Sequence, residues 1–228
     1  MHIPIAQPSL GKEENEAVLA VLASGMIAQG PVTAAFEDEF AAYCGVPHAV
    51  AVSNGTTALH AALLAAGVGP GDEVVVPAFT FFATASSVSM CGAVPVFADV
   101  DAVTATIDPA DILAKVTPKT KAVIGVHLYG QPCDAGAIRD ICNDKGLAFI
   151  EDAAQAHGAT YHGKKTGSLG DLACFSFYAT KNLATGEGGM VTTASDEYDA
   201  PLRRIINHGQ SEKYRHAELG YNYRMTDI

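Results

Sequence analysis

The chain has 228 residues, of which 49% are hydrophobic and 17% charged, and its formal net charge at pH 7 is −11. This length and apolar content are enough to bury one sizeable core, so a single domain is expected. The acidic balance, with no run of Lys or Arg longer than two, excludes the basic footprint of a protein that binds nucleic acid or an anionic membrane.

The N-terminus and the cysteines favour a cytoplasmic protein. Residues 1–18 have neither a basic segment nor a long apolar core, and no later apolar run approaches the roughly 18 residues of a membrane span. The five cysteines form no C-x-x-C pair, which suits buried thiols in a reducing compartment. The histidines show no clustered ligand spacing, so no metal site is predicted.

The first part of the chain is expected to be an extended arm over residues 1–11 and an amphipathic helix over 12–24, so residues 1–30 form an N-terminal arm and helix. After Gly30-Pro31, a second helix places Phe36, Phe40 and Tyr43 on one side.

Short apolar runs then alternate with helical stretches. The expected strands are 49–52, 73–76, 94–97, 122–126, 147–150, 173–177 and 189–193, and the expected helices are 57–66, 82–91, 109–116 and 135–145. Strands and helices that alternate at this spacing form βαβ units. The sequence therefore predicts an α/β fold with a mostly parallel central sheet covered by helices on both faces.

Candidate ligand-binding residues follow the strands, where a parallel sheet collects its ligands. The segment around Gly55 and Thr56 joins a strand to a helix; a glycine there lets the backbone approach closely, and free amides at a helix start bind anions. Taken alone, a plain Thr N-cap explains this segment equally well. Together with Ser176 and Lys181 elsewhere in the chain, we interpret it as a phosphate site.

Lys181 is the candidate reactive amine. It lies in a loop between two expected strands, with Ser176 before it and glycines after it, whereas Asp152 follows the apolar strand LAFI. A lysine taken in isolation is most simply a solvated loop residue. However, a lysine that forms a Schiff base and an acid that pairs with a pyridinium nitrogen are the two groups that pyridoxal phosphate (PLP) needs most.

An ordered set of motifs spans the chain almost from end to end. They are GPVTAAFEDEFAAYCGVPHAVAVSNGTTALHAAL, PAFTFFATASSV, HLYGQP, IEDAAQAHGA, GDLACFSFYATKN, GEGGMVTT and GYNYRMTDI. With these motifs the chain resembles the large domain of the DegT/DnrJ/EryC1/StrS family, PLP-dependent aminotransferases that act on nucleotide-activated keto-sugars. The resemblance implies the large domain of fold type I PLP-dependent transferases over residues 1–228.

The resemblance also assigns roles to residues. Lys181 would hold PLP as a Schiff base, and Asp152 would keep the pyridine nitrogen protonated, so that the ring stays an electron sink. Phe81 matches the aromatic residue that stacks on the cofactor face, and Gln155 matches a polar position near the ring hydroxyl. Glu151 should point away from the site, because neighbouring residues of a strand face opposite sides.

The phosphate of the cofactor is assigned to two further positions by the same resemblance. Ser176 matches a phosphate-binding hydroxyl, and Asn222 matches an asparagine that family dimers contribute to the site of the neighbouring subunit. A homodimer with shared active sites is therefore expected. Without the resemblance, GYNYRM could instead be a polar turn packed within its own chain. His127 is interpreted as a structural or supporting residue.

The expected activity is transfer of an amino group from an amino acid, glutamate, to a nucleotide-linked keto-sugar. Some family members have histidine at this position and are dehydratases. Because this chain has Lys181 there, dehydratase activity is not expected. Another PLP reaction on the same fold, such as an aldolase or an elimination, and a non-catalytic PLP-binding regulatory protein remain alternatives. Because family members continue beyond GYNYRMTD, a smaller C-terminal domain is expected to be missing from this chain. Whether the chain is active without that domain is therefore left open.

Overall fold

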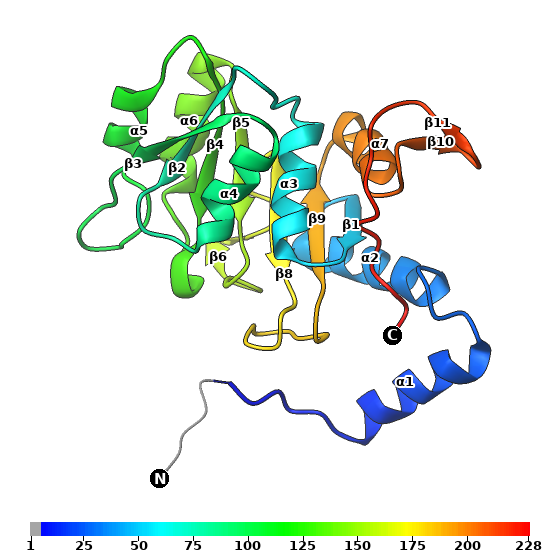
Figure 1. The fold of residues 1–228 in the computed structure, drawn as a ribbon. Coiled ribbons are helices and arrows are strands. Elements are labelled where there is room, and N and C mark those ends of the chain that lie inside the picture. Colours follow the sequence, from blue (N-terminus) through cyan, green and yellow to red (C-terminus); the bar gives the residue numbers. More distant parts are fainter. Residues whose placement is uncertain (1–5) are drawn as a thin grey trace.

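A seven-stranded sheet with the order β1-β9-β8-β5-β4-β2-β3 lies at the centre of the chain (Figure 1). The computed structural model describes residues 6–228. The strands are β1 (His48–Val52), β2 (Glu73–Pro77), β3 (Val94–Ala98), β4 (Thr120–Val126), β5 (Ala148–Asp152), β8 (Leu172–Ser176) and β9 (Gly189–Thr193). β9 runs antiparallel to both of its neighbours, whereas the other adjacent pairs are parallel. The prediction of a mostly parallel sheet is confirmed.

Helices cover both faces of this sheet, as predicted. One face packs against α2 (Pro31–Cys44), α5 (Pro109–Lys115) and α6 (Ala135–Lys145), and the other against α3 (Gly55–Ala65), α4 (Phe82–Met90) and α7 (Asp196–Ile205). Val74 and Val76 belong to the core beside α3 and α4, whereas Val75 belongs to the core beside α5 and α6. The continuous apolar run of β2 therefore reflects burial on both sides.

Several short elements were not predicted. They are the hairpin of β6 (Thr160–Tyr161) and β7 (Lys164–Lys165), the hairpin of β10 (Gln210–Glu212) and β11 (Arg215–His216), the 3₁₀ turn η1 (Leu128–Gly130), and α7. The hairpins are too short and polar to show a hydrophobic period. The α7 helix buries only Leu202 and Ile205 and contains Pro201, which conceals its helical pattern.

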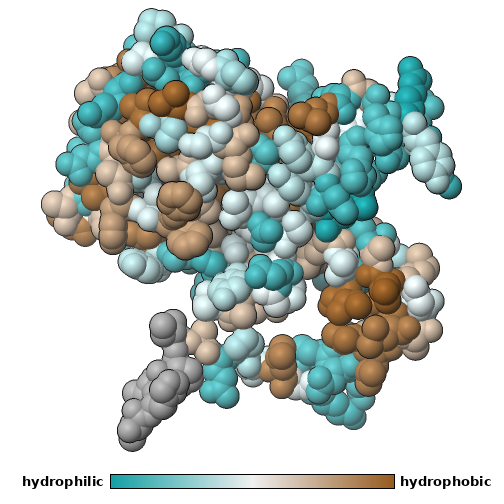
Figure 2. Space-filling view, in the orientation of Figure 1, coloured by the Kyte–Doolittle hydropathy of each residue, from teal (hydrophilic) through white to brown (hydrophobic). Residues whose placement is uncertain are grey.

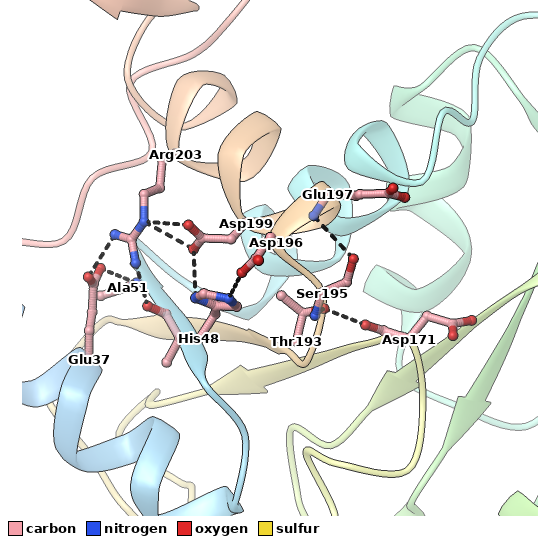
Figure 3. Close-up of polar contacts among 11 residues, drawn as sticks. Glu37, His48, Ala51, Asp171, Thr193, Ser195, Asp196, Glu197, Asp199 and Arg203 are labelled. Atoms are coloured by element: carbon pink, nitrogen blue, oxygen red, sulfur yellow. Dashed lines mark hydrogen bonds and ion pairs between the residues drawn. The ribbon is translucent and has the colours of Figure 1, made fainter.

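An ion-pair cluster attaches α7 to β1 and α2 (Figure 3). Arg203 lies between two carboxylates, with Nη1 3.0 Å from Glu37 Oε2 and Nε 3.0 Å from Asp199 Oδ1. The other oxygen of Glu37 accepts a hydrogen bond of 2.8 Å from the Ala51 amide of β1. The cluster thus joins α7 to two elements, α2 and β1, that lie about 150 positions earlier in the sequence.

The N-terminal helix α1 (Lys12–Ser24) forms as predicted, but it projects away from the sheet (Figure 1). Val21 is its buried residue, while Leu19 and Leu22 are 62% and 50% exposed. The predicted arm over residues 1–11 is described only from residue 6; the first five residues lie outside the described part. Within residues 6–228, the helices are too short or too polar to cross a membrane.

The C-terminal segment returns across the molecule and contacts the N-terminal half. The Ser53 amide donates to the Tyr223 carbonyl at 2.8 Å, directly beyond β1. Asp227 accepts hydrogen bonds from the amides of Gly30 at 2.7 Å and Thr33 at 3.0 Å, at the start of α2. The motif GYNYRMTD therefore braces the β1–α3 turn and α2.

Candidate active site

A pocket of about 780 Å³ opens at the carboxyl ends of the parallel strands. Turns after β1, β2, β4 and β5 and the loop after β8 contribute to its walls. The lining includes most of the predicted site residues, namely Gly55, Thr56, Phe81, Asp152, Gln155, Ser176 and Lys181. Residues from distant parts of the sequence are thus gathered at the edge where parallel sheets bind ligands.

The start of α3 lies beside Ser176 in the wall of the pocket, where the sequence predicts a phosphate site. The helix is capped by Asn54, whose side chain accepts from the Thr57 amide at 2.9 Å, so the alternative of a Thr N-cap is wrong. The Gly55 and Thr56 amides precede the first residue bonded within the helix and have no acceptor in the described part of the chain. A Cβ on Gly55 would lie 2.7 Å from the Ser176 Cβ, so only glycine permits this approach.

Asp152 lies at the end of β5 and is 6% exposed. Its Oδ2 accepts a hydrogen bond of 2.8 Å from Thr84 Oγ1, and its Oδ1 accepts a longer one of 3.3 Å from the Ala154 amide. Burial raises the pKa of the Asp152 carboxyl above its ordinary value, against the opposing effect of these two hydrogen bonds. A cation brought next to this carboxylate would favour its ionised form.

The adjacent Glu151 points to the other side, as predicted. Its fully buried carboxylate accepts from backbone amides within the 167–170 loop, at 2.7 to 3.0 Å, and contacts His127 Nε2 at 2.9 Å. Because the Cys133 amide donates to His127 Nδ1, the ring proton lies on Nε2 and is donated to Glu151. Glu151 and His127 therefore hold the loop and the end of β4 in place.

Lys181 lies in the loop 177–188 that joins β8 to β9. The base of this loop is closed by a hydrogen bond of 2.8 Å from the Phe177 amide to the Gly188 carbonyl, and the Lys181 amide donates to Tyr178 at 2.8 Å. Among residues 6–228, Lys181 Nζ has no hydrogen-bond or ion-pair partner. The amine is therefore held by an ordered backbone and left available to a ligand.

Phe81 and Gln155 occupy the rim and wall of the pocket. Phe81 is 73% exposed, and its neighbours Phe79 and Phe82 are exposed as well, so none of the three belongs to the core. Gln155 Oε1 accepts from the Tyr129 amide at 2.8 Å. This contact assigns the amide orientation and leaves the Nε2 hydrogens for another acceptor.

Asn222 is separate from the other predicted residues. It is exposed, it pairs with Asn207 in an isolated bridge, and it does not line the pocket of its own chain. Its contribution to a neighbouring subunit stays a prediction.

Sequence reasoning missed Thr80 and Thr84, which also shape the site. Thr80 lines the pocket, and Thr84 is the fully buried partner of Asp152. Their four-residue spacing across the start of α4 was the available signal, because it can bring the hydroxyl before the helix close to the one in its first turn.

The sheet order and the pocket define the class: this is the large domain of fold type I PLP-dependent transferases. The chain belongs to the DegT/DnrJ/EryC1/StrS aminotransferase family, whose sequence profile matches residues 8–228. It is 49% identical to GDP-perosamine synthase of Caulobacter vibrioides over 99% of this chain and 62% of that protein. It is 43% identical to dTDP-3-amino-3,4,6-trideoxy-alpha-D-glucose transaminase of Streptomyces venezuelae over 100% of this chain and 60% of that protein.

A solved structure has the same fold. The chain superposes on S. venezuelae DesV in complex with a ketimine intermediate with a TM-score of 0.92 and 45% identity, over 94% of this chain and 58% of that one. The chain thus spans about three fifths of the length of these relatives.

Proposed function

We propose that the full-length protein is a PLP-dependent aminotransferase that moves an amino group from an amino acid, glutamate, to a nucleotide-linked keto-sugar. The observation that carries this proposal is one pocket lined by a free lysine amine, Lys181, and a buried carboxylate, Asp152. The names of the two relatives above, a GDP-sugar synthase and a dTDP-sugar transaminase, support the substrate class.

The residues present fit this cofactor. The α3 amides and the Ser176 hydroxyl would hold its phosphate, because unpaired amides at a helix start favour an anion. Asp152 would pair with the ring nitrogen, Phe81 would cover the ring face, and Gln155 Nε2 would donate to the ring hydroxyl. When bound, PLP supplies an electron sink for the substrate carbanion.

Lys181 has two tasks in this proposal. Its Nζ would hold the cofactor at its aldehyde carbon, and, after a donor amine has taken that place, the same atom would accept the proton from the substrate Cα. Both roles need an amine that no other group of the protein binds. Among the described residues, Lys181 Nζ has no such partner.

We also propose that the protein is a cytoplasmic homodimer. Phe82 and Met90 of α4 and Val94 and Phe97 of β3 are large exposed apolar side chains on elements that pack together. Figure 2 shows hydrophobic surface over this part of the molecule and over α1. Apolar surface of this kind suits a second copy of the chain. The five cysteines are all buried free thiols, which supports a reducing compartment.

The test uses full-length protein with added PLP. Borohydride reduction and peptide mapping should place the pyridoxyl label on Lys181; a label on Lys164 or another lysine would overturn the assignment. Glutamate should then convert the cofactor absorbance to that of pyridoxamine phosphate and release 2-oxoglutarate. A labelled Lys181 without this conversion would favour another PLP reaction or a non-catalytic PLP-binding protein. A panel of keto-sugar nucleotides identifies the acceptor.

A further inference from the structure

A chain of hydroxyl groups leads from the pocket wall to the buried carboxylate. Thr80 Oγ1 lies 2.9 Å from Thr84 Oγ1, which lies 2.8 Å from Asp152 Oδ2. Thr80 and Asp152 line the pocket, while Thr84 is fully buried behind them. Thr80 precedes α4, Thr84 lies in the first turn of α4, and Asp152 ends β5.

The direction of this chain follows from counting hydrogens. An ionised carboxylate only accepts, so Thr84 must donate its single hydroxyl hydrogen to Asp152. The Thr84 hydroxyl has no second hydrogen, so its oxygen can only accept from Thr80. The Thr80 hydroxyl must therefore donate to Thr84 Oγ1. The two oxygens of Asp152 are consequently unequal: Oδ2 is held by the hydroxyl, whereas Oδ1 has only the 3.3 Å contact with the Ala154 amide.

We propose that Thr80 and Thr84 form a directed hydroxyl chain that positions the Asp152 carboxylate, with Thr84 as the positioning residue that turns Oδ1 toward the ring nitrogen of the cofactor. This inference rests on the proposed function. Thr84 acts in two ways. It fixes the rotation of the carboxylate, and its hydrogen bond favours the charged form that keeps the ring nitrogen protonated. Thr80 fixes Thr84 in turn.

The test compares Thr84→Val, which keeps the side-chain shape without the hydroxyl, with Thr84→Ser, which restores it. In the full-length protein loaded with PLP, Thr84→Val should bind the cofactor about 10-fold more weakly, since a hydrogen bond to a charged group is lost. The pH midpoint of the absorbance of the lysine-bound cofactor should rise, because a ring with less positive charge withdraws fewer electrons from the lysine nitrogen. Thr84→Ser should resemble the wild type in both measurements.

Two controls separate positioning from folding. Ser87→Ala removes another buried hydroxyl of α4, one that donates to the Thr84 carbonyl and does not touch Asp152, and it should leave cofactor binding and the pH midpoint unchanged. Thermal unfolding of the cofactor-free Thr84→Val protein should remain a single cooperative transition, which shows that the variant is folded. If this variant does not fold, Thr80→Val provides the test, with a smaller change in the same direction.

If Thr84→Val folds and has the wild-type cofactor affinity and pH midpoint, the hydroxyl-chain inference is wrong. The proposed function still stands in that case, provided that borohydride labels Lys181 of the wild-type protein. A wild-type protein that takes up no PLP at Lys181 would instead overturn the proposed function, and this inference with it.

Discussion

Two neighbouring carboxylates of β5 have different surroundings although they are chemically alike. Asp152 lines the pocket and retains an oxygen with only a long contact, whereas Glu151 is surrounded by the 167–170 amides and His127. Successive side chains of a strand face opposite sides of the sheet, so this difference could be predicted from the sequence. The partners of each carboxylate could not, because they come from other segments.

Substituting Asp152→Asn should leave PLP bound but reduce turnover roughly 100-fold or more, because the amide cannot stabilise a positively charged ring. Steady-state kinetics with saturating glutamate and an absorbance measurement of bound cofactor test this expectation. An Asp152→Asn enzyme with nearly wild-type turnover would mean that another residue is the partner of the ring nitrogen.

Substituting Glu151→Gln should act on stability instead. The new amide group would face backbone N–H donors, so the buried acceptor is partly lost and the free energy of unfolding should fall by about 3 kcal/mol. Urea unfolding of the cofactor-free protein measures this loss. The exposed α6 residue Asp140 offers a matched control, since Asp140→Asn should change stability by less than about 0.5 kcal/mol. Equal stability of the two variants would contradict the structural role of Glu151.

At the scale of elements, apolar runs predicted the strands well. The run of β2 is bounded by the turn before Glu73 and by Pro77, and its ends in the structure lie within a residue of those expected. The strand 173–177 was predicted one residue too late, since β8 spans Leu172–Ser176. The direction of β9 was not encoded in its own residues. It follows from the short 177–188 loop, because neighbouring strands joined without a crossover must be antiparallel.

The close approach of α3 to β8 makes Gly55→Ala a test of the phosphate site. An alanine would normally favour a helix, but its Cβ would lie 2.7 Å from the Ser176 Cβ and displace that residue. We expect cofactor affinity to fall about 10-fold, in line with an overpacking cost of roughly 1–3 kcal/mol. Equilibrium titration with PLP measures the change.

Gly69→Ala is the matched control, because a Cβ there would meet nothing within 4 Å. It should bind PLP as the wild type does. If Gly55→Ala also retained wild-type affinity, the start of α3 would not be the place where the phosphate binds.

The start of α2 is capped from the other end of the chain. Its N-cap residue, Gly30, has no side chain, and Asp227 accepts from the Gly30, Val32 and Thr33 amides instead. Burial alone would raise the pKa of Asp227, but hydrogen bonds from Thr33, Val32 and Gly30 outweigh it and lower the pKa. Its contribution to stability should therefore be complete above the unfolded pKa of about 3.9 and disappear as the pH falls through the lower folded value.

Asp227→Asn should accordingly lower the free energy of unfolding at pH 7 by about 1–2 kcal/mol, the usual range for a lost cap. Unfolding measured from pH 7 to pH 2.5 should show the wild-type and variant curves converging at the acid end. A difference that stays constant over this range would show that the charge of Asp227 is not what stabilises α2.

At the scale of the whole molecule, the order of the strands in the sheet decides which loops meet at the site. The rule that ligands bind at carboxyl ends of parallel strands predicted which segments would meet, and Lys181, Asp152 and Gly55 do line one pocket. The bond between Thr84 and Asp152 could not be predicted in this way. It joins residues 68 positions apart, and it depends on β4 lying between β2 and β5 in the sheet.

Assembly of two chains is the remaining step, and it concerns Asn222. This residue is exposed and outside the pocket lining of its own chain, while the segment that carries it is fixed by Asp227 and by the bond from Ser53 to Tyr223. A rigid segment that presents a polar side chain away from its own pocket suits a contribution to a second copy.

If each site combines Lys181 of one chain with Asn222 of the other, full-length Lys181→Ala and Asn222→Ala homodimers should both be impaired. A mixed dimer of the two variants would contain one site with both residues intact. Unfolding and refolding the variants together should therefore restore activity, approaching one quarter of the wild-type value because about half of the dimers are mixed and each has one working site. Refolding each variant alone is the control. Differently tagged chains show whether the subunits have exchanged. If they have exchanged and activity is not recovered, Asn222 lies outside a shared site.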